Sequence, residues 1–180
     1  MAIICIKVPH DAARLLEGVE VPGDRSSASD MHVTLLTFGK DLPIIDIAKA
    51  MCVCYDVISK TRSIAFSVDY IDSFDDHGSG VPVVCPIDSP EVHALWQSLK
   101  DSFDRLNIPY DTKWTEFKPH VTLSYSDEPF TGPLPAPLTW TAHDVIIWGG
   151  DSTDQRISIT IPFALTPLEK VAMKIIDALV

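Results

Sequence analysis

Two short segments of this chain share the sequence His-Val-Thr-Leu. The first begins at His32 and the second at His120, which is 88 positions later (120 minus 32). Imidazole has an unperturbed pKa of about 6.5, so it can accept or donate a proton near neutral pH. The hydroxyls of Thr34 and Thr122 can donate hydrogen bonds to developing negative charge. Together these residue types fit acid–base chemistry on a phosphodiester.

Each segment lies in a run of residues that is typical of a β-strand. Side chains at positions i and i+2 of a strand point to the same face, so each histidine projects together with its threonine. If the two pairs converge, one imidazole can take a proton from the attacking oxygen while the other gives one to the departing oxygen. This reaction requires neither a metal-binding cluster nor a cofactor. The residues leave open which histidine is the acid and which is the base.

The elements around the two segments recur in one order: strand, helix, loop, and the strand with histidine and threonine. Hydrophobic periodicity, helix caps and turn residues predict both copies. The first copy comprises a strand over 2–8, a helix over 10–17, a loop over 18–30 and a strand over 31–38. The second comprises a strand over 81–87, a helix over 90–106, a loop over 107–116 and a strand over 119–125.

The remaining segments lie between and after these copies. We expect a helix over 43–60, a strand over 63–74, an irregular loop over 127–137 that holds four prolines, and strands near 138–148 and 156–163. Residues 166–180 have the apolar stripe of an amphipathic helix. This helix would pack on the sheet, mediate self-association or lead into further polypeptide.

The two motifs resemble the signature of the 2H phosphoesterase superfamily, which is also called LigT-like or 2′-5′ RNA ligase-like. That signature is two His-x-Thr/Ser motifs, each followed by an apolar residue, as in the segments at His32 and His120. The lead-in Phe117-Lys118-Pro119 is also similar to the family's second motif. The resemblance covers about residues 1–165 and implies a metal-independent enzyme in which His32, Thr34, His120 and Thr122 are catalytic.

The resemblance also implies the architecture. We expect an α+β fold with two pseudo-symmetric lobes, each an antiparallel sheet with flanking helices, around a central cleft. By sequence order the lobes would cover approximately residues 1–80 and 81–165 of one domain, with the C-terminal helix as an addition.

The composition limits the partners. Hydrophobic residues make up 46% of the chain, which is enough for a packed core, and the formal net charge is −11. With 14 Lys and Arg against 25 Asp and Glu, the chain lacks the broad basic surface that duplex DNA requires. A small nucleotide or a short RNA end fits better.

The location is predicted from features that the sequence lacks. The four cysteines form no CxxC pair and are interpreted as reduced thiols. We find neither a secretory signal pattern nor an apolar run of membrane-spanning length. We therefore expect the protein in the cytoplasm, or in a host cytoplasm if a phage or virus encodes it, and away from membranes.

Residues beside the motifs are candidate substrate contacts, because aromatic rings stack on bases and lysine attracts phosphate. They are Phe38, Trp114, Lys118, Ser124 and Tyr125. Strict strand alternation would place Phe38 on the face of His32 and Ser124 on the face of Thr122. The same alternation would place Tyr125 on the face opposite His120.

These observations predict a phosphodiesterase that acts on a 2′,3′-cyclic phosphate, a 2′-5′ linkage or a cyclic oligonucleotide. One alternative is RNA end processing or 2′-5′ ligation, which would favour a basic groove. Another is a non-catalytic nucleotide-binding module, against which the two complete motifs argue.

Overall fold

The computed structural model describes residues 2–38, 44–76, 78, 80–113, 116–149 and 157–164, and the elements below lie within them. The helices are α1 (His10–Glu17), α2 (Ile44–Ile58) and α3 (Pro90–Arg105). The strands are β1 (Ala2–Lys7), β2 (Asp24–Arg25), β3 (His32–Thr37), β4 (Ile64–Ser73), β5 (Val81–Pro86), β6 (His120–Ser126), β7 (Gly132–Ala142), β8 (Asp144–Gly149) and β9 (Ile157–Pro162). The C-terminal helix expected over 166–180 lies outside the described residues.

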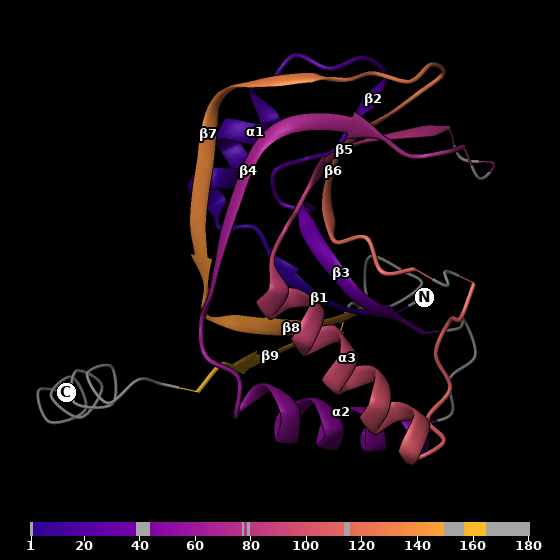
Figure 1. Cartoon of the computed structure of the whole chain (residues 1–180). Coiled ribbons are helices and arrows are strands. Elements are labelled where there is room, and N and C mark those ends of the chain that lie inside the picture. Colours follow the sequence, from indigo (N-terminus) through magenta and orange to yellow (C-terminus); the bar gives the residue numbers. More distant parts are fainter. Residues whose placement is uncertain are drawn as a thin grey trace, which may run out of the picture.

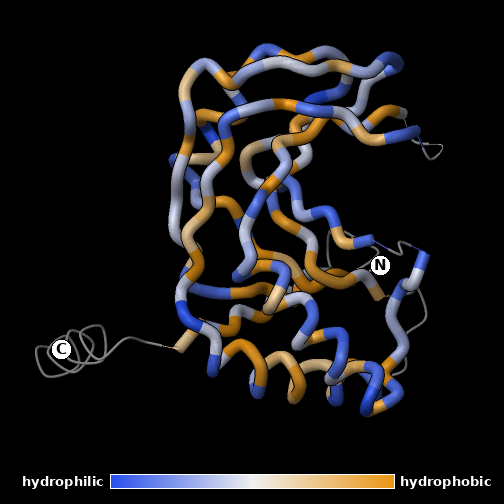
Figure 2. The backbone as a smooth tube through the Cα atoms, viewed as in Figure 1, coloured by the Kyte–Doolittle hydropathy of each residue, from blue (hydrophilic) through white to orange (hydrophobic). Residues whose placement is uncertain are grey.

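The strands form two antiparallel sheets, which confirms the expected α+β architecture. The first sheet has the order β3-β1-β8-β9 and the second the order β2-β6-β5-β4-β7. Helices α2 and α3 pack together against the first sheet, and α1 contacts β7 of the second (Figure 1). Strands β3 and β6, which carry the two motifs, contact each other where the sheets meet. Figure 2 shows apolar and polar residues interspersed along these elements, as expected of strands and helices with one buried side.

Helix α3 illustrates how local sequence and packing agree. Ser89 caps it by accepting a hydrogen bond from the Val92 amide at 3.3 Å, and Pro90 occupies the first turn. Its apolar stripe is buried and ends on Phe103, which stacks on Phe38, the residue after β3, with ring centroids 5.8 Å apart. A helix that follows a strand of the second sheet therefore packs on the first sheet and ties the lobes together.

The two lobes are interleaved in sequence, which corrects the expected division near residue 80. Strand β4 comes from the first half of the chain but pairs with β5 and β7 of the second sheet. Strands β8 and β9 come from the second half but extend the first sheet through β1. Each sheet therefore needs strands from both halves of the chain.

The region expected as a proline-rich loop and one long strand is also different. Strand β7 begins at Gly132, inside the expected loop over 127–137, and pairs with β4. Proline lacks an amide donor and is tolerated in β7 because this strand lies at the edge of its sheet. The expected strand near 138–148 divides at His143, where the chain passes from the second sheet to the first.

Gly23 lies at the edge of the second sheet, next to β6. Its φ of +84° is in the region that favours glycine, and a Cβ there would overlap the backbone carbonyl of Tyr125. Gly78 also has a positive φ, of +96°, but a Cβ on it would meet nothing within 4 Å. A side chain at either glycine would have an unfavourable backbone conformation, but only at Gly23 would it also clash with a neighbouring strand.

We expect Gly23→Ala to destabilise the protein more than Gly78→Ala. Both substitutions place alanine at positive φ, which costs about 1–2 kcal/mol. Only the first also forces β6 away, for which overpacking suggests about 1–3 kcal/mol more. Urea unfolding of the two variants measures the difference, and equal midpoints would show that the strand accommodates the methyl group freely.

Candidate active site

The two motifs occupy equivalent positions in equivalent strand pairs. In the first lobe β1 pairs with β3, and in the second β5 pairs with β6. The residues opposite the histidines and threonines follow one scheme: Lys7 opposite His32, Cys5 opposite Thr34, Pro86 opposite His120 and Val84 opposite Thr122. We call the sheet surface that carries these side chains the motif face of each lobe.

A β-bulge follows each threonine. The register between β1 and β3 skips Leu35, and the register between β5 and β6 skips Leu123. An unpaired extra residue reverses the alternation of side chains beyond it. The sequence position of a residue after the bulge therefore gives the wrong face if strict alternation is assumed.

This reversal corrects the expected faces of three candidate substrate contacts. Phe38 lies on the core side, 3% exposed and stacked on Phe103. Ser124 is fully buried and donates a hydrogen bond to the Pro22 carbonyl at 2.6 Å. Tyr125 pairs with Pro82, lies on the motif face with His120, and is 44% exposed.

The two remaining candidates lie in the segment before the second motif. The Lys118 side chain is largely exposed and forms an ion pair with Glu116 at 3.2 Å. Its backbone carbonyl, and not its ammonium, contacts His120. Trp114 lies outside the described residues.

Both imidazole rings are oriented by the same hydrogen bond. Nδ1 of His32 lies 2.5 Å from the Asp30 carbonyl oxygen, and Nδ1 of His120 lies 2.6 Å from the Lys118 carbonyl oxygen. A carbonyl can only accept, so Nδ1 carries the proton in both rings. In the neutral ring Nε2 then has a free lone pair, which is the form that a general base needs.

The rings are close enough to influence each other's ionisation. Burial lowers the pKa of both histidines below the usual 6.5. The charge of His32 lowers the pKa of His120 further, and the ammonium of Lys7 lowers that of His32. Mutual repulsion disfavours the doubly protonated state, so one neutral and one protonated ring is the state that acid–base catalysis can use.

The threonine hydroxyls are available for a ligand. Thr34 and Thr122 are half-buried on the motif faces, and within the described part of the chain neither hydroxyl has a hydrogen-bond partner. Two such donors beside two imidazoles can stabilise the nonbridging oxygens of a phosphoryl group.

Sequence reasoning missed the residues that surround the rings. Trp148 of β8 meets His32 edge to face with centroids 5.5 Å apart, and Phe74 meets His120 in the same way at 4.7 Å. Lys7 faces His32 across the strand pair. The repeated order of elements could have indicated Lys7. The strand over 2–8 belongs to the same repeated unit as the strand with His32, so the two were candidates to lie side by side.

The described residues give less support for cysteine chemistry or for metal binding. Burial raises the pKa of the Cys5, Cys54 and Cys85 thiols to about 12, so these thiols remain protonated. Among the described residues no group of three or more His, Cys, Asp or Glu side chains is placed to hold a metal ion. No helix in the described ranges has both the length and the apolar character to cross a membrane.

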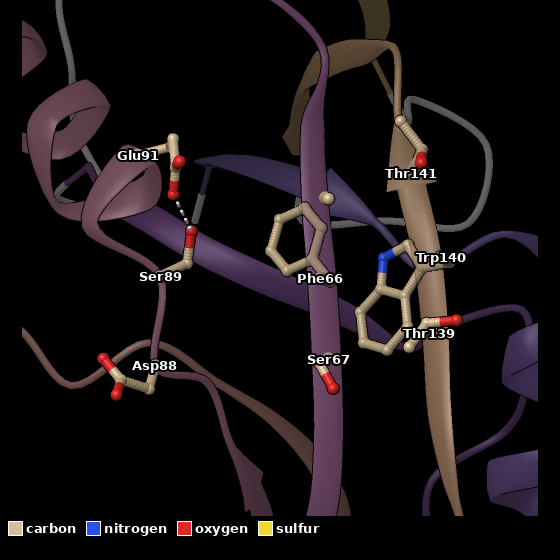
Figure 3. A pocket seen from close by; sticks show the side chains of 9 residues that line it. Phe66, Ser67, Asp88, Ser89, Glu91, Thr139, Trp140 and Thr141 are labelled. Atoms are coloured by element: carbon tan, nitrogen blue, oxygen red, sulfur yellow. Dashed lines mark hydrogen bonds between the residues drawn. The ribbon is translucent and has the colours of Figure 1, made fainter.

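A separate pocket of about 530 Å³ lies between the start of α3 and strands β4 and β7 (Figure 3). The rings of Phe66 and Trp140 stack on one side of it, and Asp88 and Glu91 line the other. None of the four motif residues lines this pocket. Its two carboxylates would repel a phosphate, so it is not the site of phosphodiester chemistry.

The chain matches a known protein family. The model of the 2′-5′ RNA ligase superfamily matches residues 8–148, which include both motifs. The chain belongs to this superfamily. It thereby groups with the 2H phosphoesterases, as the motifs indicated. A comparison with curated protein sequences found no match.

Solved structures share the fold of this superfamily member. TT0787 of Thermus thermophilus superposes with a TM-score of 0.69 at 15% identity, covering 91% of this chain and 97% of that one. Apo E. coli LigT gives a TM-score of 0.67 at 13% identity, with 91% and 97% covered. E. coli LigT complexed with 3′-AMP gives 0.63 at 13% identity, with 91% and 98% covered.

We expect ¹⁵N NMR at pH 8 to show both motif histidines as neutral rings with a proton on Nδ1. The carbonyls of Asp30 and Lys118 impose this tautomer. The exposed His10 serves as the internal reference for an unconstrained ring. Nε2–H rings at His32 or His120 would contradict the orientation described above.

Proposed function

We propose that this protein is a metal-independent phosphodiesterase that hydrolyses a small nucleotide through two-histidine general acid–base catalysis. The observation that carries the proposal is the matched pair of imidazoles, each oriented through Nδ1, with Nε2 free and the two charges coupled. Membership of a superfamily of phosphoesterases and 2′-5′ RNA ligases gives the same class of chemistry.

The reaction needs two proton transfers on opposite sides of the phosphorus. A neutral histidine removes the proton from a water or hydroxyl oxygen while that oxygen forms a bond to phosphorus. The bond to the leaving oxygen breaks, and the protonated histidine gives its proton to that oxygen. Thr34 and Thr122 donate hydrogen bonds to the nonbridging oxygens as charge develops.

The substrate class follows from the charge of the chain. A net charge of −11 disfavours a long polyanion, so a 2′,3′-cyclic nucleotide, a 2′-5′ linkage or a cyclic oligonucleotide is the proposed substrate. The known complexes of E. coli LigT with 3′-AMP, ATP and phosphate support a site for small phosphorylated ligands in this fold. We propose that the protein acts in the cytoplasm.

We expect His32→Ala and His120→Ala each to lower kcat/KM about 10²- to 10⁴-fold, because each removes one proton transfer. Thr34→Val and Thr122→Val remove one donor each and should cost about 10²- to 10³-fold. The assay follows turnover of 2′,3′-cyclic nucleotides, 2′-5′ oligoadenylates and cyclic dinucleotides in EDTA.

His10→Ala, at an exposed position, is the matched control and should retain activity. Loss of activity with EDTA would contradict the metal-independent mechanism. Joining of RNA ends without hydrolysis would assign the protein to ligation, and binding without turnover would make it a binding module.

We expect the pH profile of kcat/KM to be bell-shaped with its optimum below pH 6.5. The rate requires one neutral and one protonated histidine, and the pKa values of both are lowered by burial and by neighbouring positive charge. Initial rates between pH 4 and 9 measure the profile. An optimum above pH 7 would contradict the lowered pKa values of the two histidines.

A further inference from the structure

The two lobes match at the histidine, the threonine, the bulge and the Nδ1 hydrogen bond, but they differ at the residue opposite the histidine. Lys7 faces His32, whereas the equivalent residue facing His120 is Pro86. At this one position the first lobe therefore carries a positive charge and the second lobe carries none. This difference bears on how a substrate is oriented, which the four motif residues alone leave undetermined.

Lys7 is held in place. Its ammonium donates a hydrogen bond to the Ser29 carbonyl at 2.5 Å and lies 3.9 Å above the ring of Trp148. Trp148 in turn contacts the His32 ring. An ammonium has three donors, so donors remain after the bond to Ser29. A lysine fixed in this way loses less conformational entropy when it binds a ligand than a freely moving surface lysine does.

The charges on the motif faces favour an anion beside Lys7. Among the described residues, Lys7 is the one lysine or arginine whose charge lowers the pKa of either motif histidine. On the second lobe, Asp24 pairs with Tyr125 and Asp72 pairs with Val84, which places both carboxylates on the motif face of His120. Asp30 also places a negative charge near His32 and raises the pKa of that ring, so both lobes carry acidic side chains. The difference between the lobes is the ammonium of Lys7, which attracts a phosphoryl group toward the first lobe.

We propose that Lys7 is the phosphate-binding residue of this site, contacting a nonbridging oxygen from the His32 side and thereby fixing the direction in which the substrate binds. The proposal deepens the phosphodiesterase function proposed above and rests on it for the position of the phosphoryl group. Lys7 supplies a permanent positive charge that the largely neutral histidines lack. It also balances the second negative charge that develops in the transition state.

The nucleoside then lies toward the second lobe. There the ring of Phe74 meets His120, and the exposed Tyr125 lies on the same motif face. Aromatic rings provide a surface on which a base can stack. The preferred ligand is thus a nucleotide with its phosphate against β1 and its base against Phe74 and β6.

The test compares Lys7→Gln, Lys7→Arg and Lys60→Gln. Glutamine keeps a donor for the Ser29 carbonyl but removes the charge, and arginine keeps the charge. Lys60, largely exposed and ion-paired with Asp56, is the control. Calorimetry with inorganic phosphate, 3′-AMP and adenosine reports binding, and turnover reports kcat and KM.

We expect Lys7→Gln to weaken binding of phosphate and 3′-AMP about 10- to 100-fold and to leave adenosine binding unchanged, because one charge-assisted hydrogen bond is lost. Lys7→Arg should restore most of this affinity, and Lys60→Gln should match the unmodified protein. The acid limb of the pH profile should also move to higher pH in Lys7→Gln, because the positive charge that lowers the pKa of His32 is gone.

Unchanged phosphate affinity in Lys7→Gln, or equal losses for adenosine and 3′-AMP, would overturn the proposal, since the second result is what a purely structural role produces. Absence of phosphate and 3′-AMP binding in the unmodified protein would overturn it as well. If phosphate binding depends on Lys7 but no substrate is turned over, the anion site stands and the phosphodiesterase function fails.

Discussion

The hydrogen bond from each histidine Nδ1 to a carbonyl two residues earlier is the constraint on which the site depends. Without it an imidazole at a strand start could rotate and present either nitrogen. Both bonds stay within one strand and its lead-in, so each lobe orients its own ring. The acid–base chemistry proposed for the pair needs two such rings, and the strand geometry supplies both in the same way.

The two rings are brought together by a second feature of the fold: each lobe contains strands from both halves of the chain. Strand β4 joins the second sheet and β8 joins the first, while α3 buries its apolar stripe on the sheet opposite its own strand. A lobe that lost these elements would expose a sheet edge and an apolar face. The relative position of His32 and His120 is thus fixed by the same packing that stabilises the core.

Electrostatics then makes a symmetric framework directional. The chain is acidic, both motif histidines are biased toward the neutral form, and the first lobe carries Lys7 where the second carries Pro86. Duplication gives two equivalent sets of proton-transfer groups, but a substrate with a charged and an uncharged end is not symmetric. A single substitution between the repeats is enough to distinguish the two sides.

The two His-x-Thr pairs and most of the strands and helices could be predicted from the amino-acid sequence, because periodicity and motif spacing are local properties. The α+β class was implied by the family resemblance that the two motifs carry. The faces predicted for Phe38, Ser124 and Tyr125 were wrong, since a bulge appears only when a partner strand shows which residue is unpaired. The lobe boundary near residue 80 was wrong for the same reason: strand pairing is decided by contacts between distant segments. The positions of Lys7 and Trp148 beside His32 emerged only from the folded chain, because cross-strand neighbours depend on register and not on sequence distance.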